Sequence, residues 1–187
     1  MLESLVFYSS LAYNVVLYRL NIRAWYDRID KVVLLGALPF RGKSSQLVMT
    51  RWAPPLVVNL LLNNNNLVTT RKQLRDQENV RAVISMNHDF ELKPFSPTIE
   101  EYKKLGIEFL QLATRDFVEA PSMDNLRLGV ELIEKYVKQP DSTVYIHCKA
   151  GRTRSATLAA CYLIKVCLPL FWLLFISRLD CLLCCCC

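Results

Sequence analysis

Histidine is scarce in this chain of 187 residues, which contains only His88 and His147, and five of its eight cysteines crowd into residues 181–187. No Cys-x-x-Cys pair has partner histidines, so the sequence offers no ligand set for zinc and predicts no cofactor. The cysteine spacing also differs from that of a disulfide framework. This favours a reducing compartment, in which a reactive thiol stays free.

The chain has only a small excess of positive charge. The 23 basic residues exceed the 17 acidic ones modestly, for a net charge of +6, which suits an anionic membrane surface or an acidic substrate. No nucleic-acid-binding motif is present, so no nucleic-acid partner is expected. The length is that of one domain with a full hydrophobic core.

The N-terminal segment, residues 1–24, has one acidic residue, Glu3, and carries Arg19 and Arg23. Its apolar residues are interrupted by Ser9-Ser10 and other polar residues, so no clean membrane-spanning stretch emerges. An acid-poor, amphipathic stretch of this kind fits mitochondrial targeting or peripheral membrane contact. A plain helix that packs on the domain fits the sequence equally well.

The most informative stretch runs from His147 to Ser155, with the sequence His-Cys-Lys-Ala-Gly-Arg-Thr-Arg-Ser. It follows the alternating apolar run at 143–146, typical of a strand end, and precedes residues 156–164, which begin like a helix. A strand, a tight loop and a helix turn successive backbone N–H groups toward one point, in front of the positive end of the helix dipole. The pattern predicts a cradle for an anion.

Side chains in this loop add chemistry to the cradle. Cys148 at a helix N-terminus is stabilised as the thiolate, which is the nucleophilic form of cysteine. Arg154 presents a permanently charged, planar fork that takes two phosphoryl oxygens at once. Gly151 permits the backbone turn and a close approach to phosphate, and Ser155 donates its hydroxyl to the Cys148 sulfur. The expected substrate-binding residues are Lys149, Ala150, Gly151, Arg152, Thr153 and Ser155.

The pattern His-Cys-x-x-Gly-x-x-Arg-Ser resembles the signature of the cysteine-dependent protein-tyrosine and dual-specificity phosphatases. The fuller wording from His147 to Thr157 is closer still to one branch, the mitochondrial phosphatidylglycerophosphate phosphatases, also called mitochondrial protein-tyrosine phosphatases. The resemblance covers about residues 1–43 and 73–166. Further matching segments are residues 25–30, 34–39, 78–81, 84–87 and 102–106.

The resemblance implies a phosphatase that hydrolyses a phosphomonoester through a phosphocysteine intermediate, without a metal. Within this branch, the expected reaction converts phosphatidylglycerophosphate to phosphatidylglycerol for cardiolipin biosynthesis, on the matrix side of the mitochondrial inner membrane. The same residues would serve a phosphatase that acts on phosphotyrosine, phosphoserine or phosphothreonine in proteins. A third interpretation is a truncated, non-catalytic form that only binds phosphate.

Thiolate attack also needs a proton donor for the leaving oxygen, because an alkoxide departs poorly. The relatives carry an aspartate on a loop some thirty residues before the cysteine, and Asp116 lies 32 residues before Cys148. Asp116 follows an apolar run at 107–112, so it falls at the exit of a strand, where loops carry catalytic groups. Asp124 is the rival acid, but its place after Ser122 favours a first-turn helix charge. The expected catalytic residues are Cys148, Arg154 and Asp116.

Lys149 and Arg152 are not required by the loop geometry, so they bear on the choice of substrate. They favour a strongly anionic substrate, such as a phospholipid headgroup with a second phosphate; that both point to solvent is the open alternative. Residues 87–91, Asn-His-Asp-Phe-Glu, match the position of an acidic substrate loop, Glu-Glu-Tyr-Glu in that branch. His88 and Phe90 depart from that wording, and a lone histidine is more typical of a loop than of a catalyst.

Alternating strands and helices predict an α/β fold with a central, mostly parallel sheet flanked by helices, as the cysteine-phosphatase resemblance also implies. Thr98 and Glu101 predict a capping box with Gly106 as the helix stop, and residues 122–139 show a buried helical stripe. The expected strands are residues 32–35, 82–86, 107–112 and 143–147.

The phosphatase-like domain is expected at residues 25–166, with an apparent insertion at about 44–71 that includes four successive asparagines. Residues 167–187 form an atypical hydrophobic, cysteine-rich tail in which Pro169 breaks the preceding helix. The C-terminal helices that cover the sheet in the relatives are therefore not expected here. The tail has two open interpretations: membrane contact or acylation, and an alternative or mispredicted 3′ end.

Overall fold

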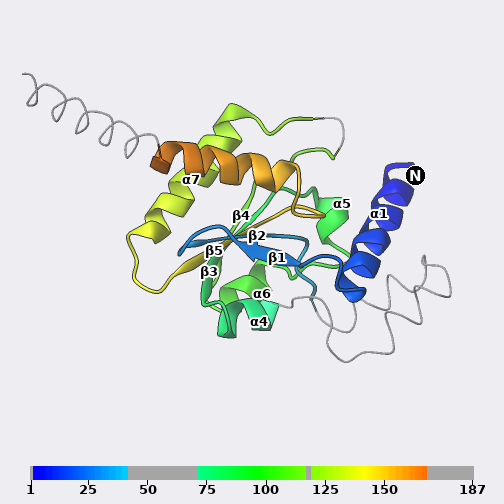
Figure 1. Ribbon diagram of the computed structural model, residues 1–187, viewed down its shortest axis with the longest axis horizontal. Coiled ribbons are helices and arrows are strands. Elements are labelled where there is room, and N and C mark those ends of the chain that lie inside the picture. Colours follow the sequence, from blue (N-terminus) through cyan, green and yellow to red (C-terminus); the bar gives the residue numbers. More distant parts are fainter. Residues whose placement is uncertain (1, 42–70, 117–118, 168–187) are drawn as a thin grey trace, which may run out of the picture.

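The computed structural model describes residues 2–41, 71–116 and 119–167. Five strands form one sheet in the order β1-β2-β5-β3-β4. Only the β1–β2 pair is antiparallel, so the expected α/β fold with a mostly parallel sheet is confirmed (Figure 1). The strands are β1 (Tyr26–Arg28), β2 (Val33–Gly36), β3 (Val80–Ser85), β4 (Glu108–Gln111) and β5 (Thr143–His147).

Helices cover both faces of the sheet (Figure 1). One face carries α7 (Met123–Val137) and the helix over residues 154–167, and the other carries two short helices, α4 (Arg71–Asp76) and α6 (Ile99–Lys104). Two further helices, α1 (Leu2–Arg19) and α5 (Asp89–Leu92), lie beside one end of the sheet.

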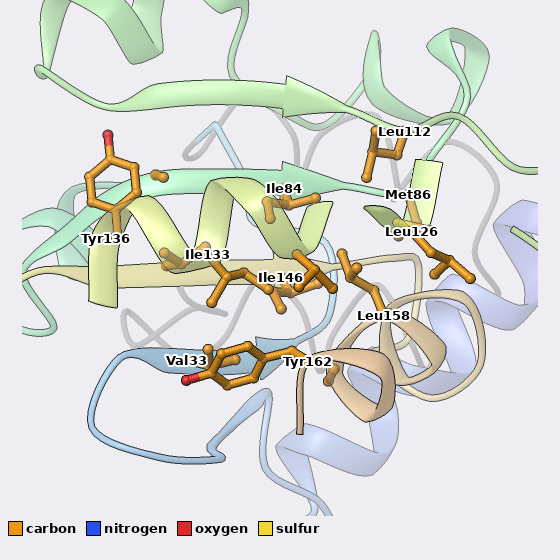
Figure 2. Close-up of a cluster of buried hydrophobic side chains, with 14 of the residues drawn as sticks. Val33, Ile84, Met86, Leu112, Leu126, Ile133, Tyr136, Ile146, Leu158 and Tyr162 are labelled. Carbon is orange, nitrogen blue, oxygen red and sulfur yellow. The ribbon is translucent and has the colours of Figure 1, made fainter. Parts of the chain in front are cut away.

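Strand alternation divides the core into two layers. Along β5, Val144 and Ile146 point to the α7 face, while Tyr145 between them points to the α6 face. All three are fully buried, as expected for a central parallel strand covered on both sides. Figure 2 shows the larger layer, in which Ile133 of α7 and Leu158 of the last helix approach the sheet.

The helix ends follow the expected capping signals. Thr98 accepts from the Glu101 backbone N–H, and the Glu101 carboxylate accepts from the Thr98 N–H at 2.9 Å, which completes the predicted capping box of α6. Gly106 after this helix has φ +67°, the left-handed conformation of a helix stop. Ser122 caps α7 by accepting from the Asn125 N–H at 3.2 Å.

The N-terminal helix α1 packs on the domain. Phe7, Leu11 and Val15 are buried against a cluster that includes Trp25 and Phe95. Its other side is open, with Tyr13 62% exposed. One face of the segment thus packs on the domain, while mitochondrial targeting and membrane contact stay predictions. Among the described residues, no helix has the length and apolarity needed to cross a membrane.

The structure cannot be compared with two predictions, those for the insertion and for the C-terminal tail. The insertion at about 44–71 and the tail at 167–187 lie, apart from Arg71 and Cys167, outside the described residues. One strand was not predicted: β1 has only three residues, two of them exposed, so it carries no alternating apolar pattern.

Candidate active site

The loop after β5 lies at the carboxyl end of the central strand and leads directly into the helix over residues 154–167. Cys148 opens the loop and is 2% exposed. Its sulfur accepts two hydrogen bonds, one from the Gly151 backbone N–H and one from the Ser155 hydroxyl, both at 3.2 Å. The loop therefore closes around the sulfur as the sequence predicts.

The surroundings of Cys148 favour its ionised form. Burial raises the pKa of this thiol, but the charge of Arg154 and hydrogen bonds from Ser155 and from the loop backbone outweigh burial. The pKa of Cys148 therefore falls below its ordinary value. A buried thiolate with a cation and several donors around it is a prepared nucleophile.

Arg154 is fixed by a buried carboxylate. Its Nη1 and Nη2 donate to the two oxygens of Glu91 at 2.8 and 3.0 Å, and the exposed fractions of the two side chains are 3% and 1%. Nη1 also donates to the Thr114 carbonyl oxygen at 2.8 Å. Burial lowers the pKa of Arg154, but Glu91 together with the charges of Cys148 and Asp116 raises it above its ordinary value, so the guanidinium is firmly charged.

One edge of the Arg154 guanidinium stays available to a ligand. Its Nε has no hydrogen-bond partner among the described residues and lies 3.4 Å from an Asp116 carboxylate oxygen. A buried N–H that lacks a hydrogen-bond partner is costly, and an anionic ligand can supply that partner. The Nε edge, which is not bonded to Glu91, is therefore the part of the guanidinium left for a phosphoryl group at Cys148.

Asp116 lies beside the loop, where the expected proton donor belongs. It forms an ion pair with Lys149, and the exposed fractions of these side chains are 18% and 5%. The Lys149 ammonium also lies 5.7 Å from the centre of the Phe7 ring of α1. Of the two open placements for Lys149, solvent exposure is therefore wrong. The lysine points into the site and reaches the candidate acid.

The other candidate residues are less tightly gathered. Arg152 and Thr153 are exposed at the rim of the loop, and the Ala150 carbonyl oxygen faces away to accept from Arg23. Asp124 lies on the surface, with a side chain that is 89% exposed and pairs with Arg127. The rival acid thus has the surface position that its place at a helix start predicts.

Two residues with clear roles in the geometry were not predicted. Glu91 belongs to the 87–91 segment, but the sequence does not indicate its pairing with Arg154, because 63 residues separate the two. The sequence pattern places Arg23 only in the acid-poor, amphipathic N-terminal segment. His88, in contrast, is the N-cap residue of α5 and stacks on the Phe90 ring at 6.3 Å, as an ordinary loop histidine would.

A buried thiolate, a fixed guanidinium and a nearby carboxylate around a strand-loop-helix cradle define a cysteine-dependent phosphatase. Comparisons with known proteins agree. The family model described as "Polymorphic toxin system, DSP-PTPase phosphatase" matches residues 62–167. The chain belongs to this DSP-PTPase family and is a phosphoric monoester hydrolase of the cysteine-dependent type.

Individual relatives are similar over most of the chain. Human "Phosphatidylglycerophosphatase and protein-tyrosine phosphatase 1" is 39% identical over 168 residues, which are 88% of this chain and 70% of the relative. The Arabidopsis thaliana phosphatidylglycerophosphate phosphatase PTPMT1 is 36% identical over 162 residues, 86% of this chain and 38% of that protein. The crystal structure of PTPMT1 in complex with PI(5)P matches at 39% identity and a TM-score of 0.58, over 76% of this chain and 74% of that one.

Proposed function

We propose that this enzyme hydrolyses the phosphomonoester of phosphatidylglycerophosphate to give phosphatidylglycerol, with Cys148 as the nucleophile, Arg154 as the phosphate-binding cation and Asp116 as the acid. The observation that carries the proposal is the Cys148 sulfur, which accepts two hydrogen bonds at 3.2 Å beside a guanidinium whose Nε makes no hydrogen bond to the described residues.

The first step transfers the phosphoryl group to sulfur. The Cys148 thiolate attacks phosphorus, the bond from phosphorus to the ester oxygen breaks, and protonated Asp116 gives its proton to the leaving oxygen. Arg154 and the backbone N–H groups of residues 149–154 bind the equatorial oxygens, where negative charge is held during transfer. The alcohol then leaves and a phosphocysteine remains.

The second step releases phosphate. Asp116, now a carboxylate, takes a proton from water as that water attacks phosphorus, and the bond from phosphorus to sulfur breaks. The Ser155 hydroxyl donates to the departing sulfur from 3.2 Å, which stabilises the thiolate as it reforms. Asp116 ends protonated and Cys148 ionised, so the enzyme is ready for another substrate.

The lipid substrate is supported by the relatives and by the charge of the loop. The relatives named above are phosphatidylglycerophosphate phosphatases, and one solved structure holds a phosphoinositide. Arg152 is exposed at the loop rim, where it can meet the second phosphate of such a headgroup. A second candidate, a protein phosphatase, is favoured by the protein-tyrosine phosphatase activity in the human relative's name.

Phosphate release from phosphatidylglycerophosphate vesicles tests the proposal. We expect turnover by the full chain and loss of most of it in Cys148→Ser and in Arg154→Lys. Release that persists in Cys148→Ser would remove this sulfur from the mechanism. A higher kcat/KM on a phosphotyrosine peptide than on the lipid would favour the protein substrate, and vanadate binding without turnover would favour a non-catalytic form.

We also propose that the enzyme works at the matrix side of the mitochondrial inner membrane. The family resemblance and the net charge of +6 support this location, because the substrate and that membrane surface are anionic. Fractionation of mitochondria followed by protease protection tests it. Protein that is digested in intact mitochondria would contradict the matrix location.

A further inference from the structure

The peptide group between Ala150 and Gly151 is bonded on both sides. Its N–H donates to Cys148 Sγ at 3.2 Å, and its carbonyl oxygen accepts from Arg23 Nη2 at 2.9 Å. A cation on the carbonyl side polarises an amide, which makes its N–H a stronger donor. Arg23 thus acts on the sulfur through a single peptide group.

Arg23 reaches this carbonyl because of the way α1 ends. Asn21 has φ +54°, and the N–H groups of Asn21 and Ile22 donate to α1 carbonyls at 3.0 Å, which is the pattern of a Schellman motif. The motif turns the chain back toward the helix, and Arg23 Nη1 donates to Asn14 Oδ1 at 2.8 Å.

Asn14 is itself held in place. It is 8% exposed, and its Nδ2 donates to the Ser10 carbonyl oxygen at 2.9 Å. Both ends of the amide are therefore used, one toward α1 and one toward Arg23. The guanidinium is clamped between a helix side chain and the phosphate-binding loop, so its hydrogen bond to Ala150 is fixed in direction.

The charges agree with this geometry. Burial lowers the pKa of Arg23 and the like charge of Arg152 lowers it further, while the Cys148 thiolate works in the opposite direction. Stabilisation between two charges is mutual, so Arg23 favours the Cys148 thiolate. The other titratable or charged groups around the sulfur are Arg154, Tyr145 and His147, with Glu91, Asp116 and Lys149 beyond them.

We propose that Arg23 is a positioning residue that stabilises the Cys148 thiolate by fixing and polarising the Ala150–Gly151 peptide. The inference rests on the proposed role of Cys148 as the nucleophile. It gives the end of α1 a part in the reaction, beyond packing or membrane contact. Removal of Arg23 leaves the peptide free to tilt and its N–H a weaker donor.

The pH dependence of Cys148 alkylation by iodoacetamide tests this, with the modified residue identified by mass spectrometry of its peptide. This readout needs no phosphatase turnover. In Arg23→Ala we expect the midpoint to rise by about one pH unit, so that alkylation below the midpoint slows about tenfold. Arg23→Lys keeps a charge and a donor and should restore most of the wild-type profile.

Arg28→Ala is the matched control, because Arg28 is a half-exposed arginine at the end of β1, away from the loop, and pairs with Glu78 just before β3. Its midpoint should equal that of the wild type. Asn14→Ala frees the Arg23 side chain and should raise the midpoint by a smaller amount.

A folded Arg23→Ala variant with the wild-type midpoint would overturn the inference. If this variant does not fold, Arg23→Gln and Asn14→Ala decide, and wild-type midpoints in both would overturn it as well. A wild-type midpoint near that of a free thiol, about pH 8.5, would instead contradict the nucleophile assigned under the proposed function. The two failures are therefore distinguishable.

Discussion

Gly151 packs directly against the backbone of Gly36: a β-carbon on Gly151 would lie 2.7 Å from both the carbonyl carbon and the carbonyl oxygen of Gly36. Gly36 ends β2 and pairs in register with His147 of β5. Gly151 also has φ +71°, a conformation that other residues rarely adopt. The close approach brings the phosphate-binding loop against the neighbouring strand and sets where its N–H groups point.

Gly151→Ala should therefore impair both the loop and the reaction. The left-handed conformation costs a non-glycine residue about 1–2 kcal/mol, and relief of the contact with Gly36 must shift the loop. Because misplacement by about 1 Å can cost about 100-fold, we expect kcat/KM to fall at least that far. Steady-state kinetics and thermal unfolding measure the two effects.

Gly106→Ala is the control for backbone strain alone. Gly106 has φ +67°, but a β-carbon there would meet nothing within 4 Å. The Gly106→Ala variant should lose a similar amount of stability to backbone strain but keep its activity. Equal kcat/KM values for the two variants would show that the Gly36 contact does not position the loop.

Glu91→Ala should destabilise the fold strongly. It leaves the guanidinium of Arg154, which is 3% exposed, without its carboxylate, and breaking a buried pair costs about 3–5 kcal/mol. Urea denaturation measures the free energy of unfolding. The matched control is Glu134→Ala, which removes a partly exposed partner of Lys165 and should change stability by less than about 1 kcal/mol. Similar losses in both variants would contradict a special role for the buried pair.

Asp116→Asn should slow substrates with poor leaving groups by about 10²–10⁴-fold. An activated aryl phosphate needs little help from an acid, so its rate should change far less. Kinetics on an alkyl and an aryl phosphate make the comparison, with Asp124→Asn as the control because that side chain is 89% exposed. Equal losses on both substrates would count against the acid role of Asp116.

His147 should make the enzyme less stable as the pH falls. Burial, with the charge of Arg154 added, lowers its pKa from 6.5 to about 3, against a weaker opposing effect of the Cys148 carbonyl. Between these pH values the unfolded chain binds a proton that the folded chain does not. The free energy of unfolding therefore decreases by about 1.4 kcal/mol for each unit by which the pH is lowered.

Urea denaturation of the wild type and His147→Gln at pH 7 and pH 5 measures this contribution. The difference in stability between the two pH values should be smaller in the variant, by about 2 kcal/mol. Identical pH dependence in the two proteins would exclude His147 as its source.

The sequence predicts the four parallel strands within one or two residues at each end because buried apolar runs mark them. Strand β5 is predicted at the residues it occupies, Thr143–His147, since it is buried along its whole length. The short β1 has two exposed residues and gives no such signal. The strand expected at 107–112 is shorter in the structure, at Glu108–Gln111. Strand ends depend on which backbone groups pair, and the apolar pattern carries no information about that pairing.

The same distinction applies to the site. Cys148, Gly151, Arg154 and Ser155 are recognisable because their roles depend on spacing within one loop. Glu91 acts across 63 residues and Arg23 acts through a backbone carbonyl that any residue at position 150 would supply. Neither contact leaves a pattern in the sequence. The acidic residues of segment 87–91 indicate only that this segment lies near the site, and they do not indicate the pairing with Arg154.

Five parts of the fold bond to the loop between Cys148 and Arg154: the segment after α1 through Arg23, α5 through Glu91, and the segments after β2, β3 and β4 through Leu38, Met86 and Thr114. A surface loop usually exchanges its amide hydrogens with solvent after small local openings. Here an opening of the whole loop must break contacts with all five parts together. The Gly151 N–H, which donates to the Cys148 sulfur, should consequently exchange more slowly than the amides of Arg152 and Thr153, which are exposed at the loop rim.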